Sequence, residues 1–174
     1  MTNLQYPIGP VHFPAVVTAA MRTEWIDTIA TTPARVRGAV AGLNATQLDT
    51  PYRPAGWTVR QVVHHLPDSH LNAYLRCKLA LTEEHPTVKA YDEGRWAELP
   101  DSAGPIEGSL ALLDHLHSRW VSLLRALPEP AFARTCVHSA SGATLSVDRL
   151  VATYAWHGSH HLAHITGLRH REGW

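Results

Sequence analysis

Four histidines fall within eight residues near the C-terminus, in the stretch WHGSHHLAH at 156–164. Imidazole nitrogens bind divalent ions such as zinc, and two histidines four residues apart on a helix share one face. The stretch contains two such pairs, His157 with His161 and His160 with His164. Each pair could supply part of a metal site, and the residues around it indicate which pair points inward.

His157 and His161 fall on an apolar helical stripe together with Leu150, Tyr154 and Leu168. Residues at steps of three, four or seven lie on one face, so both imidazoles are expected to point into the protein. A pair of this kind is as typical of a hydrogen-bonded core as of a metal site. A third ligand from another element is needed to favour the metal.

His160 and His164 fall on a more polar row, which extends back to Arg149 and Thr153 and forward to Gly167. This pair is the weaker ligand candidate. We expect it to pack or hydrogen-bond around the site.

A second histidine cluster lies at 64–70, in HHLPDSH. His64 shares a row with charged and amide side chains, which indicates a solvated face, whereas His65 lies at the edge of the core. His70 is in register with Val63 and Cys77, so we interpret it as a hydrogen-bonded core histidine. His65 is therefore the candidate third ligand. The remaining histidines are expected at the surface: His12, His85, His115, His117, His138 and His170.

These side chains need helices to position them, and helical periodicity predominates. The first helical segment spans about 17–43, with an interruption predicted at Thr31-Thr32-Pro33. The capping-box pattern Thr58-Val59-Arg60-Gln61 starts a second helix that runs to about Glu84. Pro67 should kink that helix just after His65.

Proline and glycine in 85–105 indicate a long crossover loop. A third helix is predicted over 106–126, and a helical turn at 129–134 and a small hairpin around Ser141-Gly142 lead to a last helix over 147–170 capped by Ser146. Prolines in 1–17 indicate an extended arm. The fold class is therefore all-α, a four-helix bundle with a long crossover, and such bundles often build metal sites from facing helices.

The composition predicts one domain spanning residues 1–174, with 45% hydrophobic and 17% charged residues. Fifteen basic and fifteen acidic side chains cancel, which disfavours nucleic acid or an anionic membrane as partner. Neither a leader nor an apolar run of about 20 residues is apparent, so a cytoplasmic protein is expected. Cys77 and Cys136 lack metal or redox spacing and are expected to be reduced, partly buried thiols.

Motifs along nearly the whole chain resemble the YfiT-like branch of the DinB superfamily. They include QLDTPYR at 47–53, GWTVRQVVHHL at 56–66, DSH at 68–70, YDE at 91–93 and the C-terminal WH..HH.AHI. The resemblance implies a DinB-type bundle, usually a homodimer, that holds one divalent ion per subunit through three histidines. By motif these are His65, His157 and His161, the same residues that the face analysis favours. Pro67 departs from the family, where alanine is usual, and puts in doubt the helix geometry beyond His65.

Three imidazoles leave a divalent ion an open position for water or substrate, and imidazole suits zinc and nickel. The resemblance implies either transfer of a small thiol such as bacillithiol, mycothiol or glutathione to an electrophile, or hydrolysis of a small ester or amide. It favours thiol transfer slightly. Asp68, one turn beyond His65, is a candidate catalytic or ligand-orienting acid, and Tyr91, Asp92 and Glu93 could rim the pocket. A metal-binding stress protein without turnover is the alternative from another class.

Overall fold

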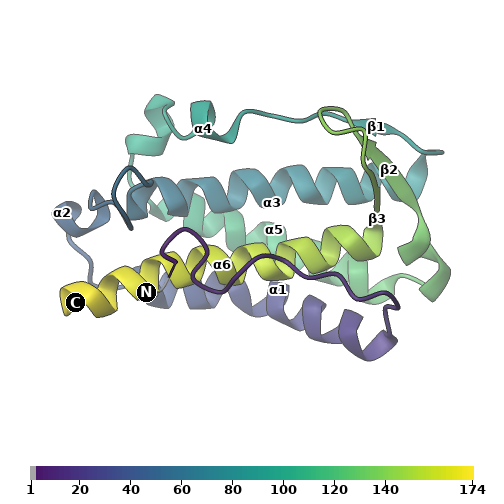
Figure 1. The fold of residues 1–174 in the computed structure, drawn as a ribbon, viewed down its shortest axis with the longest axis horizontal. Coiled ribbons are helices and arrows are strands. Elements are labelled where there is room, and N and C mark those ends of the chain that lie inside the picture. Colours follow the sequence, from purple (N-terminus) through teal and green to yellow (C-terminus); the bar gives the residue numbers. More distant parts are fainter. Residues whose placement is uncertain (1–2) are drawn as a thin grey trace.

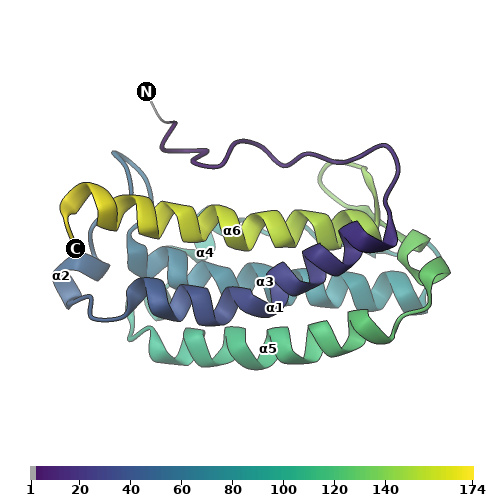
Figure 2. The same cartoon turned by 90° about the horizontal axis from the view of Figure 1, so that it is seen from below.

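The computed structural model describes residues 3–174, and four long helices make up most of it. Helices α1 (Ala19–Val40), α3 (Val59–Thr82), α5 (Glu107–Ala126) and α6 (Val147–Glu172) lie side by side (Figures 1 and 2). The predicted four-helix bundle is therefore confirmed. Helices α1 and α6 run in one direction along the bundle, and α3 and α5 run in the other (Figure 2).

The helices begin where the sequence places capping residues. Thr58 caps α3 in a complete capping box with Gln61, and the Ser146 side chain accepts a hydrogen bond from the backbone N–H of Arg149 at the start of α6. Both side chains satisfy backbone donors that the first helical turn leaves free. At the other end of α6, Gly173 adopts a φ of 72°, a left-handed conformation that costs glycine little.

Helix α1 is continuous, and the break predicted at Thr31-Thr32-Pro33 is wrong. Pro33 lies inside the helix and is buried. Its missing N–H leaves the carbonyl of Ile29 without a helical donor, because an α-helix pairs residue i with residue i−4. Burial of Ile29 and Val36 against the other helices, both fully buried, offsets that loss and keeps the helix intact. Pro67 is also accommodated within α3, which continues to Thr82.

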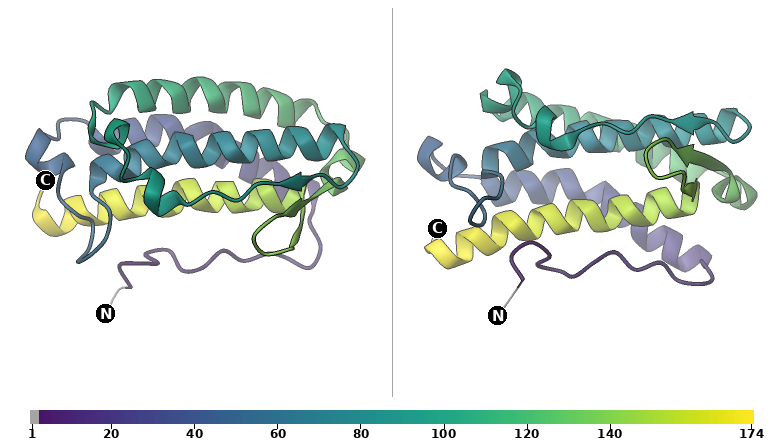
Figure 3. Two further views of the ribbon diagram at one scale, coloured as in Figure 1. Left: turned by 90° about the horizontal axis from the view of Figure 1, so that it is seen from above. Right: turned by 45° about the horizontal axis from the view of Figure 1, so that its top comes forward.

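A long crossover joins α3 to α5 and runs back along α3 (Figures 1 and 3), as predicted for 85–105. This return explains why two consecutive long helices run in the same direction. The connections between the long helices contain short elements: α2 (Ala45–Leu48), β1 (Thr87–Val88), α4 (Glu93–Trp96), the 3₁₀ helix η1 (Pro100–Ala103) and the 3₁₀ helix η2 (Glu129–Ala133).

A small three-stranded sheet closes one end of the bundle (Figure 1). Strands β2 (Thr135–His138) and β3 (Thr144–Ser146) form the predicted hairpin, and β1 of the crossover pairs in parallel with β2. The parallel pairing was not predicted, because β1 has only two residues and therefore no alternation to detect.

The N-terminal arm is extended, as predicted, over the part that the structure describes, residues 3–17. It runs along α6 on the side away from α5 (Figure 2). The indole Nε1 of Trp156 donates to the Gly9 carbonyl at 3.1 Å, and the Arg149 guanidinium lies 4.3 Å from the centre of the Phe13 ring. The arm therefore covers a face of α6 that the bundle leaves open.

Two apolar clusters fill the bundle, one toward each end. On α6 the first extends from Val147 to Ala155 and the second from Leu162 to Leu168. On α3 the same two clusters end at Ala73 and Leu66, respectively. The residues between them form a polar layer across the middle of the bundle. This layer contains His70, His157, His160 and His161, and the other histidines of the two sequence groups, His64, His65 and His164, lie at its edge.

Among residues 3–174, no helix combines the length and apolar character needed to cross a membrane. Cys77 and Cys136 are both free thiols and both buried, in agreement with the sequence-based expectation.

Candidate metal centre

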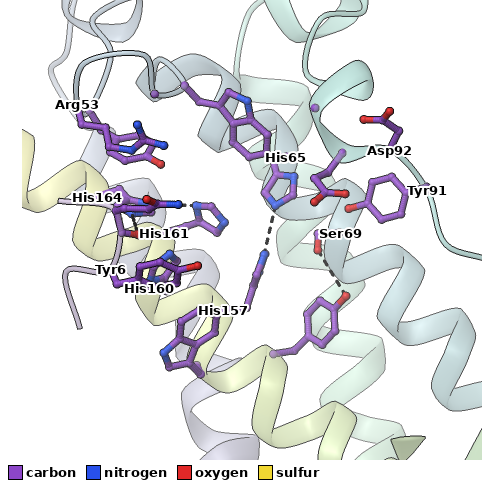
Figure 4. A pocket seen from close by; sticks show the side chains of 18 of the residues that line it. Tyr6, Arg53, His65, Ser69, Tyr91, Asp92, His157, His160, His161 and His164 are labelled. Carbon is purple, nitrogen blue, oxygen red and sulfur yellow. Dashed lines mark hydrogen bonds between the residues drawn. The ribbon is translucent and has the colours of Figure 1, made fainter. Parts of the chain in front are cut away.

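Three histidines from two helices converge at the polar layer. His65 projects from α3, and His157 and His161 project from successive turns of α6 (Figure 4). One nitrogen of each ring lies within 4.8 Å of the others, and the Nε2 atoms of His65 and His157 are 3.2 Å apart. The structure thus brings together the three residues that the sequence singled out.

The three imidazoles are held neutral by their surroundings. Burial lowers the pKa of His65 to about 4. Burial also lowers the pKa of His157 and of His161 well below the ordinary value, and neighbouring histidines lower both further. Because a neutral ring keeps a lone pair on one nitrogen, each of the three can act as a metal ligand near pH 7.

The donor set and its spacing fit a divalent ion. Two nitrogens bound tetrahedrally at about 2.0–2.1 Å from one zinc ion would be roughly 3.3 Å apart. The observed 3.2 Å between His65 and His157 is close to that value. In residues 3–174, no carboxylate or thiolate joins this group. An ion held by three imidazoles would therefore keep an open position.

Behind His157 lies a row of buried rings. Its Nδ1 is 3.1 Å from His70 Nε2, and His70 Nδ1 is 2.9 Å from His117 Nε2. His117 Nδ1 in turn lies 2.6 Å from the carbonyl oxygen of Ile29 in α1. The interpretation of His70 as a hydrogen-bonded core histidine agrees with this geometry. The prediction of His117 at the surface is wrong, because its side chain is only 1% exposed.

The sequence did carry a signal for His117. It lies four residues after Leu113 and three before Trp120, and both of these are core residues of α5. That spacing places His117 on the apolar stripe of its helix. Of the other histidines expected at the surface, four are exposed and His138 is half-buried: His12, His85, His115 and His170 are the exposed ones.

The N-terminal arm covers His160 and His164, which lie next to His161 on α6. His164 Nδ1 lies 3.3 Å from His161 Nδ1, and His164 Nε2 lies 3.3 Å from the Gln5 carbonyl oxygen. Tyr6 packs against His160 at 5.8 Å between ring centres. Both His160 and His164 are buried, although their helix row is polar. They surround the cluster, as expected, because the arm takes the place of solvent over that row.

His64 is also buried, and its predicted solvated position is wrong. Its Nδ1 lies 2.7 Å from Ser109 Oγ of α5, and its Nε2 lies 3.1 Å from the Gly104 carbonyl oxygen of the crossover. The polar row that it shares on α3 faces these polar groups. The chain connection that follows α3 therefore covers a face that appears solvated from α3 alone.

Asp68 is half-buried on α3 and does not line the cavity at the cluster. Burial raises the pKa of its carboxyl, the charge of Asp101 raises it further, and His64 lowers it. No hydrogen bond or ion pair joins Asp68 to the three histidines, so its catalytic role stays a prediction.

The cluster lies in the wall of an open cavity of about 1120 Å³ (Figure 4). Tyr91, Asp92 and Glu93 of the crossover line this cavity, as the sequence indicated, and Ser69 and Tyr154 line it from the bundle. Burial raises the pKa of Tyr91 to about 12 and also raises that of Tyr154, so both phenols keep their protons. The Ser69 hydroxyl donates to the Tyr154 hydroxyl oxygen at 3.5 Å.

Aromatic side chains enclose the cluster on another side. The Trp57 ring lies 4.6 Å from the centre of the His65 ring and 6.2 Å from that of His161. Tyr52 stacks on His164 at 3.9 Å. These two residues lie in the connection before α3, where no helical periodicity indicates a face, so their place in the site was missed.

Known proteins resemble this chain over its whole length. The family model of the DinB superfamily matches residues 28–165. Proteins named "putative metal-dependent hydrolase" are 52% identical in Oceanobacillus iheyensis, over 99% of each chain, and 49% identical in Bacillus mycoides, over 100% of each. The solved structure of YfiT from Bacillus subtilis, described as a probable metal-dependent hydrolase with an unusual four-helix bundle topology, is 47% identical, covers 99% of each chain and has a TM-score of 0.96.

Proposed function

We propose, from the premise that this chain belongs to the DinB superfamily, that it is an enzyme with one zinc or nickel ion held by His65, His157 and His161. The observation that carries the proposal is the convergence of three neutral imidazoles at the wall of an open cavity. An ion with three histidine ligands and a free position is typical of catalytic rather than structural sites. When bound, such an ion lowers the pKa of a thiol or water molecule in the open position.

The remaining side chains would bind and orient the substrate. Trp57 covers one side of the ligand rings and keeps water from that side. Tyr91 and Tyr154 retain their protons, so their hydroxyls can donate hydrogen bonds to a polar group of the substrate. These phenols come from the crossover and from α6, which places donors on two sides of the cavity.

The reaction that we favour is transfer of a small thiol to an electrophilic carbon. The thiol sulfur forms a bond to that carbon, the leaving group departs with its electron pair, and the thiol proton is released to solvent. Two features support this choice. The cavity of about 1120 Å³ exceeds the roughly 300–1000 Å³ usual for a single ligand and can hold two substrates. In the described chain, no carboxylate joins the three histidines to act as a base toward water.

Hydrolysis of a small ester or amide is the second candidate. The relatives carry the name of metal-dependent hydrolases, and Asp92 and Glu93 line the same cavity. Either carboxylate could accept a proton from water if substrate binding draws that carboxylate toward the cluster. Thiol transfer and hydrolysis need the same ion, so they are distinguished by substrate.

Elemental analysis of the purified protein tests the metal, and two assays test the reaction. We expect one ion per chain, consumption of a small thiol only when an alkylating electrophile is present, and no turnover of an ester and amide panel. Hydrolysis without thiol consumption would support the second candidate. Bound metal with neither activity would refute both enzyme proposals and leave a metal-binding protein without turnover.

Single substitutions test the ligands. His65→Ala, His157→Ala and His161→Ala should each abolish stoichiometric binding and leave the far-ultraviolet circular dichroism of the helices unchanged. His160→Ala is the matched control, because His160 is equally buried on the same helix but does not belong to the cluster. Loss of the ion from His160→Ala alone would contradict the ligand assignment.

A further inference from the structure

A row of hydrogen-bonded rings crosses three helices and links the metal centre to a backbone carbonyl on a fourth helix. It runs from His157 on α6 through His70 on α3 and His117 on α5 to the carbonyl oxygen of Ile29 on α1. Neither His70 nor His117 lines the cavity, and both are almost fully buried, at 0% and 1% exposure. They cannot touch a substrate there, so any role in the reaction passes through His157.

The carbonyl at the end of the row sets its direction. Pro33 has no N–H, so Ile29 lacks the helical donor that its carbonyl would otherwise have, and His117 supplies one at 2.6 Å. A carbonyl oxygen only accepts hydrogen bonds. The proton of His117 is therefore on Nδ1, and in a neutral ring its Nε2 is an acceptor.

Each further hydrogen bond of the row also needs one donor and one acceptor. His70 must donate from Nδ1 to His117 Nε2, because two lone pairs facing each other at 2.9 Å would repel. His70 Nε2 then accepts, and His157 donates to it from Nδ1 at 3.1 Å. The lone pair of His157 is left on Nε2, the atom that lies 3.2 Å from His65 Nε2.

We propose that His70 and His117 are positioning residues that keep the proton of His157 on Nδ1 and thereby leave Nε2 free to bind the ion. The inference rests on the metal site proposed above. The rings also restrict rotation of His157, since its second nitrogen is held from the opposite side. Such partners of a ligand histidine usually contribute about 10–100-fold to metal affinity.

The first test uses the unaltered protein without metal. Ring ¹⁵N chemical shifts distinguish a protonated from an unprotonated nitrogen, so NMR of ¹⁵N-histidine-labelled protein, assigned with His157→Ala, reports the tautomer of His157. We expect the proton on Nδ1. A proton on Nε2 would overturn the inference, and this result would come from a protein in which every residue of the row is unaltered.

The second test compares two replacements of His117 that are similar in size. Leucine leaves the Nδ1–H of His70 without an acceptor. The proton of His70 can then move to Nε2 and be donated to His157 Nδ1, which places the proton of His157 on Nε2. Glutamine offers an amide oxygen that can accept from His70 and an N–H that can donate to Ile29. We expect His117→Leu to weaken zinc binding about 10–100-fold in a chelator competition and to shift the ¹⁵N signals of His157. His117→Gln should restore much of both.

Two control variants separate positioning from general destabilisation. Leu113→Ala removes a core side chain of α5 and leaves every ring of the row in place, and His115→Leu changes an exposed histidine of the same helix. Both should keep the zinc affinity and the His157 tautomer, although Leu113→Ala lowers stability. The inference fails if Leu113→Ala weakens zinc binding as much as His117→Leu does, or if His117→Leu changes neither measurement. If the unaltered protein binds neither zinc nor nickel, the metal proposal fails, and the tautomer measurement still tests the row.

Discussion

The same substitution, glycine to alanine within a helix, should have opposite effects at two positions. Gly158 lies on α6 directly after His157 and faces α1. A Cβ atom at this position would lie 2.9 Å from Thr32 Cγ2 and 3.0 Å from Thr32 Oγ1. Thr32 has little freedom to move, because it is 1% exposed and its hydroxyl donates to the Thr28 carbonyl at 2.8 Å. Gly38 on α1 is exposed, and a Cβ there meets nothing within 4 Å.

The expected magnitudes follow from these contacts. Replacing a helical glycine by alanine gains up to about 1 kcal/mol of stability through backbone entropy. At Gly158 the methyl group approaches Thr32 more closely than van der Waals contact allows, and overpacking of this kind costs about 1–3 kcal/mol. Gly158→Ala should therefore be net destabilising by roughly 1 kcal/mol, or about 2–4 °C in Tm for a chain of this size. Gly38→Ala should stabilise by a similar amount.

Urea and thermal unfolding of four proteins test this reasoning: the unaltered chain, Gly158→Ala, Thr32→Ala and the double variant. Thr32→Ala removes both close atoms and leaves Cβ of residue 32 at 3.5 Å, an ordinary contact. The double variant should thus be more stable than the sum of the single changes predicts. If Gly158→Ala stabilises as much as Gly38→Ala does, or if the two changes at 158 and 32 are additive, the close packing of α1 against α6 is refuted.

Three further outcomes follow from the buried groups. Arg22 donates to Asp148 through Nε at 2.6 Å and Nη2 at 3.0 Å, and both side chains are mostly buried, so Asp148→Asn should cost about 1–3 kcal/mol in urea unfolding; an unchanged midpoint would contradict this. Burial raises the pKa of the Cys77 thiol to about 12, so iodoacetamide should leave it unmodified at pH 8 until the protein unfolds, as mass spectrometry would show. Burial lowers the pKa of His117 to about 4, so between pH 6.5 and 4 this ring is protonated only in the unfolded chain. As the pH falls through this range, this one ring should therefore lower the stability of the metal-free protein by roughly 1.4 kcal/mol per pH unit. His117→Leu should show a correspondingly shallower loss below pH 6.5, and equal slopes would argue against a neutral buried ring.

Local patterns determined most of the bundle in advance. Helical periodicity and capping residues such as Thr58 and Ser146 are properties of a short stretch of chain, so the helices begin close to the predicted positions. The same periodicity separates inward from outward faces within one helix. It therefore identified His157 and His161 on an apolar stripe, and it favoured His65 as their partner.

The tertiary structure decided which polar faces are covered. His64 lies on a row that was predicted to be solvated, and His160 and His164 lie on a second polar row, but the crossover, α5 and the N-terminal arm pack over these rows. Periodicity gives the angle at which a side chain leaves its helix, and it carries no information about which segment lies opposite. Burial of a polar face therefore depends on contacts between segments far apart in the sequence.

The row behind His157 shows the same limit. Its rings come from three helices, and the row ends at the Ile29 carbonyl on the fourth helix, α1. That carbonyl lacks a helical donor because Pro33, four residues later, has no N–H. From the sequence, Pro33 predicted a helix break and His117 a surface residue. The packed bundle keeps the helix continuous and directs the unpaired carbonyl at His117. A hydrogen-bond network of this kind exists only once the helices are assembled, because each of its bonds joins groups that are distant in sequence.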